Sequence, residues 1–333
     1  MRHATLQSRR GYAMTDLLCA MCVAGLVVSV GLPLISAARK QTRADLSRNR
    51  MVELSKLQMR YANDYGGTFY FPWVQQPFAS GFSIHARSGG LWKLTTSGEQ
   101  LGMMWYSHLQ QEYGTIAEKG ELTQFAPDDA MRVGQFRDAI NTRPDWIEDG
   151  IWACSYQLSP TVWYKPSMYA AENSRNDHIS SNLRPNRIDD VANPSSKVLL
   201  FERLGFYNAA GSPVGVSGQP RTWAHPDARV NVSLVDGSVV PIEMQAVDAL
   251  ATSADPWINS VFMPSGTWKL GLAQGLTDDM LPPVNPYPAG LTDFRAFFWA
   301  TRNGIAGRDI DRERIRRVTP QNISPVATAQ SIQ

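Results

Sequence analysis

Residues 9–38 read RRGYAMTDLLCAMCVAGLVVSVGLPLISAA, and this stretch decides how the rest of the chain is organised. Two arginines and a glycine precede Tyr12, and after Asp16 no formally charged side chain appears until Arg39. The 22 residues from Leu17 to Ala38 are enough to cross about 30 Å of hydrocarbon as one helix. We therefore expect a membrane-spanning helix that carries a single carboxylate on its first turn.

Asp16 is the unusual residue of this helix, because a carboxylate in a bilayer costs about 2.5–3.5 kcal/mol on insertion scales and normally has a partner. The segment resembles the N-terminus of type IV prepilins and of type II secretion pseudopilins. The resemblance implies that a membrane peptidase cuts after Gly11 and that the new amine of Tyr12 is methylated. It also implies that Asp16 pairs with the amine of a neighbouring subunit in a filament, although the usual residue there is Glu, one methylene longer.

Two other fates of the apolar segment fit its composition. Residues 36–38, Ser-Ala-Ala, loosely match a signal-peptidase site, and cleavage there would release a secreted protein. An uncleaved segment would instead be a simple single-pass anchor. Basic residues flank both ends of the segment, so charge alone does not fix its orientation. The pilin resemblance implies a bacterial inner-membrane protein with its head in the periplasm or outside the cell.

The helix is expected to continue beyond the membrane. Pro33 lies where pilin-like helices commonly carry a proline, which removes one backbone donor and loosens the helix. No helix breaker follows until Gly66-Gly67, and an apolar stripe recurs at residues 44, 47, 51, 54, 57, 61 and 65. We therefore predict one helix over residues 12–66, with residues 17–38 in the membrane and an end at the glycine pair.

Residues 67–317 are predicted to form an exported α+β head with an antiparallel sheet, in a pilin-like arrangement with the long helix packed on it. Four β-prone stretches lie between turn residues, at 68–74, 151–158, 197–201 and 230–242. The clearest is a hairpin around a two-residue Asp236-Gly237 turn, and a type I′ turn would place Val239 opposite Leu234. Residues 1–11 form the leader, and the polar tail over 318–333 is expected to be disordered.

His225 lies just upstream of this hairpin, with ten residues between it and Asp236. The combination resembles an H-x-DG signature, usually with a gap of about nine residues, near the C-terminus of a large bacterial group of pilin-like proteins. Residues 193–202 resemble the strand that precedes that signature. A structural interpretation assigns Asp236 and Gly237 to the turn, whereas a catalytic interpretation makes His225 and Asp236 the pair of an exported hydrolase.

The sequence does not predict an enzyme. It contains no phosphate-binding loop, no nucleophile elbow and no metal-ligand spacing. The acidic pairs at 189–190 and 278–279 could bind Ca²⁺ but are expected to be solvated loop acids. Ten tryptophans could form a glycan-binding surface if they were grouped, or build the core if they were scattered. Cys154 is the single cysteine of the head, so no disulfide can form within it.

Charge gives little direction, since the formal net charge is +2 and no basic patch predicts nucleic-acid binding. The apolar helix predicts the lipid bilayer as a partner. The resemblance implies three more partners: a prepilin peptidase, other pilin-like subunits in a homo- or hetero-filament, and an inner-membrane assembly platform. The alternative function is a single-pass, membrane-anchored extracytoplasmic binding protein, with glycans as one candidate class of ligand.

Overall fold

The structure of the chain is a computed structural model. It describes residues 14–71, 82–85, 91–94, 105, 109, 126–127, 154–169, 184–205, 223, 228–252, 297–298 and 301–318. The chain divides into two compact units, Met1–Asp45 and Leu46–Gln333. Several features expected from the sequence lie outside the described residues: the leader with Gly11, Tyr12, His225, the acidic pair 278–279 and the tail beyond residue 318.

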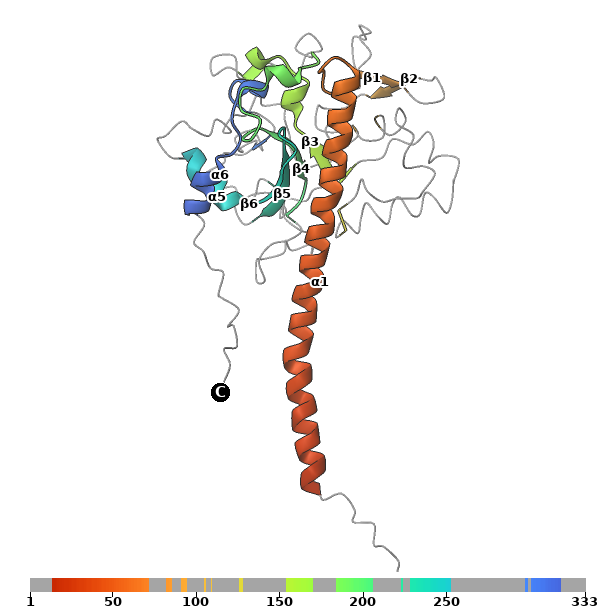
Figure 1. The fold of residues 1–333 in the computed structure, drawn as a ribbon, viewed down its shortest axis with the longest axis vertical. Helices are drawn as coiled ribbons and strands as arrows, with labels where there is room; N and C mark the ends of the chain where they lie inside the picture. The colour runs from red at the N-terminus through yellow and green to blue at the C-terminus, as the bar shows by residue number, and fades with distance from the viewer. Residues whose placement is uncertain are drawn as a thin grey trace, which may run out of the picture. The chain divides into compact units, whose positions relative to one another are not determined.

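Helix α1 runs without a break from Met14 to Asp64 and is drawn in red to orange in Figure 1. It ends at the glycine pair, where Gly66 has φ +64° and Gly67 has φ +83°. The N–H of Gly67 donates to the carbonyl oxygen of Ala62, five residues earlier, at 2.6 Å. This is the 6→1 hydrogen bond of a Schellman C-cap. The prediction of one long helix that stops at Gly66-Gly67 is therefore confirmed.

The first unit holds the apolar part of α1, whose large apolar side chains are exposed. Leu17 is 62% exposed and Leu34 is 64% exposed, for example. Within the described ranges one helix is long and apolar enough to cross a membrane, with a mean hydropathy of 2.4 in its most apolar window. A signal sequence near the N-terminus can meet the same criteria of length and apolarity. Helix α1 continues through Pro33.

The second unit contains the rest of α1, which buries one face of the helix. Its fully buried residues recur with the 3.6-residue period of a helix, and they are Ser47, Met51, Leu54, Ser55, Gln58 and Ala62. The predicted stripe was right at 47, 51 and 54 but wrong at Tyr65, which is 49% exposed. Leu57 and Tyr61 of the stripe pack partly buried against the core, and the buried face also includes Ser55 and Gln58, which apolarity alone does not mark.

A four-stranded antiparallel sheet forms the centre of the second unit, in the order β3-β4-β5-β6. Its strands are Tyr156–Leu158, Val198–Glu202, Arg229–Leu234 and Val239–Glu243. A separate hairpin pairs β1 (Phe82–His85) with β2 (Leu91–Leu94). The segment predicted as a strand from Thr68 contributes only an isolated bridge between Thr68 and Arg187 over its described residues. The coarse α+β prediction is confirmed.

Short helices complete the unit. Helix α5 (Met244–Thr252) follows β6 directly, and it packs beside α6 (Arg312–Val318), as Figure 1 shows. Within the described residues, 3₁₀ turns are η1 (Pro160–Val162), η2 (Pro166–Tyr169), η4 (Ile188–Asp190) and η8 (Gly304–Ala306).

Polar side chains, rather than apolar ones alone, join α1 to the sheet. Ser47 Oγ lies 2.5 Å from Glu202 Oε1 and 2.9 Å from the Tyr156 hydroxyl. About two turns further along the face, Ser55 Oγ lies 2.5 Å from Ser233 Oγ. All of these side chains are buried. Because buried hydrogen-bonding groups are costly unless they are paired, this polar layer fixes the register of α1 on the sheet.

The opposite face of the sheet is aromatic. Phe201 lies 5.1 Å from Trp223 and 5.6 Å from Phe298, measured between ring centroids. Trp105, Trp163 and Trp223 are the tryptophans whose side chains the structure describes, and all three are fully buried. Each of these indole N–H groups donates to a backbone carbonyl oxygen at 2.8–3.0 Å. These three tryptophans therefore build the core, as the scattered interpretation predicted.

The C-cap of α1 provides a test of the helix end. A Cβ at Gly66 would meet nothing within 4 Å, so only its left-handed backbone opposes substitution. We expect Gly66→Val to lower the free energy of unfolding by about 1–2 kcal/mol. The matched variant Gly66→Asn should cost much less, because asparagine tolerates this conformation. Denaturant unfolding of the detergent-solubilised protein measures both, and equal losses for the two variants would contradict the assignment.

Candidate functional site

Asp16 lies in the first turn of α1, as the sequence predicted. The structure describes its backbone but not its side chain, and Gly11 and Tyr12 lie outside the described residues. A negative charge at this position also interacts favourably with the positive end of the helix dipole, by about 0.3–1 kcal/mol at an exposed site. A carboxylate on the first turn is therefore favourable for the helix itself.

The predicted hairpin forms, but its turn differs from the prediction. The N–H of Gly237 donates to the carbonyl oxygen of Leu234 at 2.9 Å, and Gly237 has φ +83°. Within the turn only Gly237 has a positive φ, whereas a type I′ turn needs two such residues. The loop is therefore a three-residue turn over 235–237, and Val239 pairs with Ser233 instead of Leu234. The dipeptide Asp-Gly is compatible with both the predicted two-residue turn and the observed three-residue turn, because its glycine adopts a left-handed backbone in each.

Asp236 makes the contacts of a turn residue. Its Oδ1 accepts a hydrogen bond from the Ser238 N–H at 2.9 Å and another from the Ser238 hydroxyl. Arg312 of α6 donates to the same hydroxyl and lies 4.0 Å from Asp236 Oδ1. The loop is thereby connected to the C-terminal helix, which favours the structural interpretation of Asp236.

The two segments that carry the signature resemblance lie next to each other. The N–H of Val235 donates to the carbonyl oxygen of Lys197 at 3.0 Å, and that of Asp236 donates to Pro194 at 3.2 Å. A third segment, residues 301–311, joins the same place through the N–H groups of Asp309 and Ile310, which both donate to the Ser196 carbonyl oxygen. We call residues 193–197, 234–238 and 301–312 together the C-terminal clamp.

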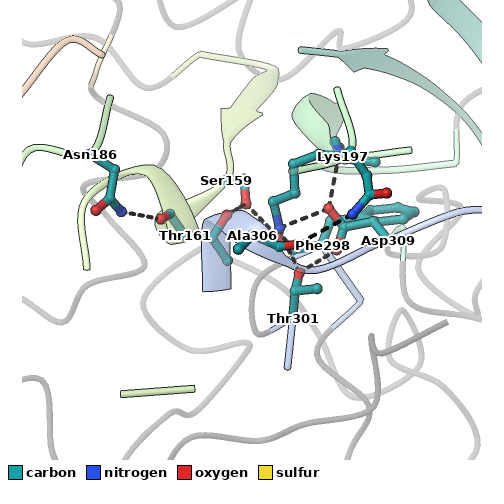
Figure 2. Close-up of polar contacts among 10 residues, drawn as sticks. Ser159, Thr161, Asn186, Lys197, Phe298, Thr301, Ala306 and Asp309 are labelled. Atoms are coloured by element: carbon teal, nitrogen blue, oxygen red, sulfur yellow. Dashed lines mark hydrogen bonds and ion pairs between the residues drawn. The ribbon is translucent and has the colours of Figure 1, made fainter. Parts of the chain in front are cut away.

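A buried ion pair lies at the centre of this clamp (Figure 2). Lys197 Nζ is 3.0 Å from Asp309 Oδ2, and both side chains are 0% exposed. Thr301 Oγ1 accepts a hydrogen bond from Lys197 Nζ at 2.7 Å and donates to Asp309 Oδ1. The backbone N–H of Val198 donates to Asp309 Oδ2 at 2.9 Å. Each oxygen of the carboxylate is thus hydrogen-bonded.

Burial has a direct electrostatic effect on this pair. It lowers the pKa of the Lys197 ammonium below its ordinary value, and the neighbouring Asp309 carboxylate opposes that shift. Burial also raises the pKa of the nearby Tyr169 hydroxyl, with Tyr164 and Asp309 adding to the effect. Desolvation of such a pair offsets much of its Coulomb attraction, so it is an unusual device if stability alone is required.

Sequence reasoning missed this pair. It assigned Lys197 to a strand and gave Asp309 no role. The available signal was local: Lys197 directly precedes the apolar run Val-Leu-Leu-Phe of β4, where an unpaired charge would be costly. The identity of the partner could not be found locally, because Asp309 lies far away in the sequence.

Polar contacts extend from the clamp toward η1. Ser159 Oγ donates to the Phe298 carbonyl oxygen at 2.6 Å and lies 2.8 Å from Thr161 Oγ1 (Figure 2). Asn186 in turn donates to the Thr161 carbonyl oxygen at 2.7 Å. Phe298 has φ +66°, a conformation that costs a bulky residue about 1–3 kcal/mol and persists only when its surroundings hold it.

The acidic pair in η4 is engaged by arginines. Asp190 Oδ2 accepts from Arg184 at 3.1 Å and from the Arg187 N–H at 2.8 Å, while Asp189 lies 3.8 Å from the Arg187 guanidinium. In the part of the chain that the structure describes, no group of three or more His, Cys, Asp or Glu side chains is placed to hold a metal ion.

No protein-family model, no curated protein and no solved structure matches this chain. The case for a function therefore depends on the sequence pattern and the geometry of the chain itself.

The role of Asp236 can be tested by two substitutions. We expect Asp236→Ala to lower the free energy of unfolding by about 1 kcal/mol, because the Ser238 N–H loses its acceptor. Asp236→Asn keeps an oxygen acceptor and loses only a part-exposed ion pair, so it should cost less than about 0.5 kcal/mol. If denaturant unfolding shows the same loss of free energy for both variants, the charge of Asp236 stabilises the loop and the turn hydrogen bond does not.

Proposed function

We propose that this chain is a structural subunit of a type IV pilus-like or type II secretion pseudopilus filament. It is made as a precursor, and a prepilin peptidase cuts it after Gly11. Its mechanism is assembly rather than catalysis: Tyr12 supplies the new, methylated amine, Asp16 neutralises that amine, and residues 17–38 pack together in the filament core.

The continuity of α1 is the observation that carries this proposal. Residues 17–38 of the helix expose apolar side chains, whereas from Ser47 onward the same helix buries one face within the α+β unit. A simple anchor needs only the first of these parts. A filament subunit needs both: an apolar helix for the filament core and a continuation of that helix within its head.

The charge pattern supports the same proposal. Asp16 is the single charge in the described helix before Arg39. Cleavage after Gly11 places a protonated amine four residues before Asp16. In the proposed filament, the amine of a neighbouring subunit pairs with the carboxylate. Pairing the two charges offsets the cost of about 2.5–3.5 kcal/mol that each lone carboxylate incurs in hydrocarbon.

The surface of the apolar segment is suited to close helix packing. A Cβ built at Gly25 or Gly31 meets nothing within 4 Å, so both positions leave room for another backbone. Small residues of this kind allow helices to approach closely in a membrane. Before assembly, the subunit waits in the bacterial inner membrane with its head outside the cytoplasm, where it meets the assembly platform.

The rival proposal, a membrane-anchored glycan-binding protein, depended on grouped aromatic residues at the surface. The tryptophans with described side chains are buried instead, so they lend it no support. The two proposals also differ in what happens to residues 1–11, because a simple anchor retains them.

Intact-mass analysis of the membrane-extracted protein tests the proposal. We expect the mass of a chain that begins at Tyr12, with or without one added methyl group. Gly11→Val should block the cut, because the resemblance places glycine at the cleaved bond. Gly25→Ala serves as the control, since it alters a glycine of the same segment and should leave processing unchanged.

Either of two other masses would contradict the proposal. A retained leader would support the simple anchor, and a chain that begins after Ala38 would support a secreted protein.

A further inference from the structure

We propose that Lys197 and Asp309 condense to form an intramolecular isopeptide bond, which ties the start of β4 covalently to the segment before α6. This inference goes beyond the filament proposal and does not depend on it. Four observations in the clamp carry it: the approach of the two groups, their burial, a hydroxyl that bridges them, and a backbone donor on the carboxyl group.

The reacting groups are held together and shielded from water. Lys197 Nζ lies 3.0 Å from Asp309 Oδ2, and neither side chain is exposed. Hydrogen bonds fix the backbone around both residues, because the Asp309 N–H donates to Ser196 at 2.9 Å and the Val235 N–H donates to Lys197 at 3.0 Å. Such fixed proximity replaces the entropy that two free reactants would lose.

Burial provides the reactive protonation states. In a site without water, transfer of a proton from the ammonium to the carboxylate removes two buried charges and leaves an amine and a carboxylic acid. The lowered pKa of Lys197 agrees with this direction. A desolvated lysine amine is an effective nucleophile, whereas an ammonium is not.

Thr301 and Val198 occupy the positions that the reaction needs. Thr301 Oγ1 accepts from Lys197 Nζ and donates to Asp309 Oδ1, so it can pass a proton from the nitrogen to that oxygen. The Val198 N–H donates to Oδ2 at 2.9 Å, where negative charge develops when the nitrogen attacks. Figure 2 shows the lysine, threonine and aspartate of this arrangement together.

The step is balanced without any co-reactant. The Nζ lone pair of the neutral amine attacks Cγ of the Asp309 carboxyl group, which carries its proton on Oδ1, and a Cγ–Nζ bond forms. One proton moves from Nζ through Thr301 to Oδ1, the Cγ–Oδ1 bond breaks, and Oδ1 leaves as water. Oδ2 remains as the amide oxygen and keeps its hydrogen bond from Val198.

The bond would hold the end of the head in place. Residues 301–311 carry Asp309 and precede α6, whose Arg312 contacts the hairpin turn. A covalent link between Lys197 and Asp309 keeps this segment on the sheet when the hydrogen bonds of the clamp open. Such a link restrains the chain as a disulfide would, and residues 67–317 cannot form a disulfide among themselves because Cys154 is their single cysteine.

The experiment is mass spectrometry of the full-length, detergent-extracted protein, fresh and after incubation. We expect a mass lower by one water molecule than that of the processed sequence. Complete tryptic digestion of the denatured protein should give a branched peptide that joins residues 188–203 to residues 309–312, with no cut after Lys197. Neither half of this peptide includes residues 1–11. Absence of the peptide would therefore contradict the isopeptide proposal, whereas a failure of leader cleavage would contradict only the filament proposal.

Three variants complete the test. Lys197→Met removes the nucleophile and should show the full mass of its sequence, whereas Lys165→Met removes an exposed lysine and should still lose one water. Thr301→Val keeps the shape of the side chain but removes the relay, so condensation should be at least about tenfold slower. Wild-type protein that keeps its full mass and is cleaved after Lys197, in both fresh and incubated samples, would overturn the proposal. Condensation at an unchanged rate in Thr301→Val would overturn the role of the hydroxyl.

Discussion

One uninterrupted helix has to satisfy two environments, and the rest of the structure follows from that constraint. Up to Ala38 its side chains are apolar and exposed, so they are suited to lipid or to other apolar helices. From Ser47 onward the same helix presents a buried face that includes hydroxyl and amide groups. A soluble core helix would lack the first surface, and a plain membrane anchor would lack the second.

The polar layer explains how such a helix is held in one register. Ser47 and Ser55, two turns apart, meet Glu202 and Ser233 on the sheet, and Glu202 also accepts from the Asn231 N–H at 2.7 Å. Apolar side chains tolerate sliding, but buried hydrogen bonds lose their partners when a helix moves. The C-terminal clamp fixes the position of residues 301–312 at the other end of β4 in the same way, through the buried Lys197–Asp309 ion pair.

Local signals allowed the sequence to predict the long helix, its end and the central hairpin. The end of α1 and the turn of the hairpin each need a residue with a left-handed backbone. Short local sequences, Gly66-Gly67 and Asp236-Gly237, indicate where those residues are. The turn type was predicted wrongly because it depends on how the two strands pair, and the stripe was extended too far because Tyr65 lies beyond the end of α1. The Lys197–Asp309 pair could not be predicted, since the structure alone brings those two segments together.

The most direct measurement of the central claim is assembly by chains altered at Asp16. Filaments sheared from cells, together with cross-linked ladders of the membrane-extracted subunit, report assembly independently of folding. If the carboxylate neutralises the amine of a neighbouring subunit, Asp16→Glu should assemble as the parent does. Asp16→Asn, which removes only the charge, should give monomers in the membrane with the head intact. Normal filaments from Asp16→Asn would contradict the account.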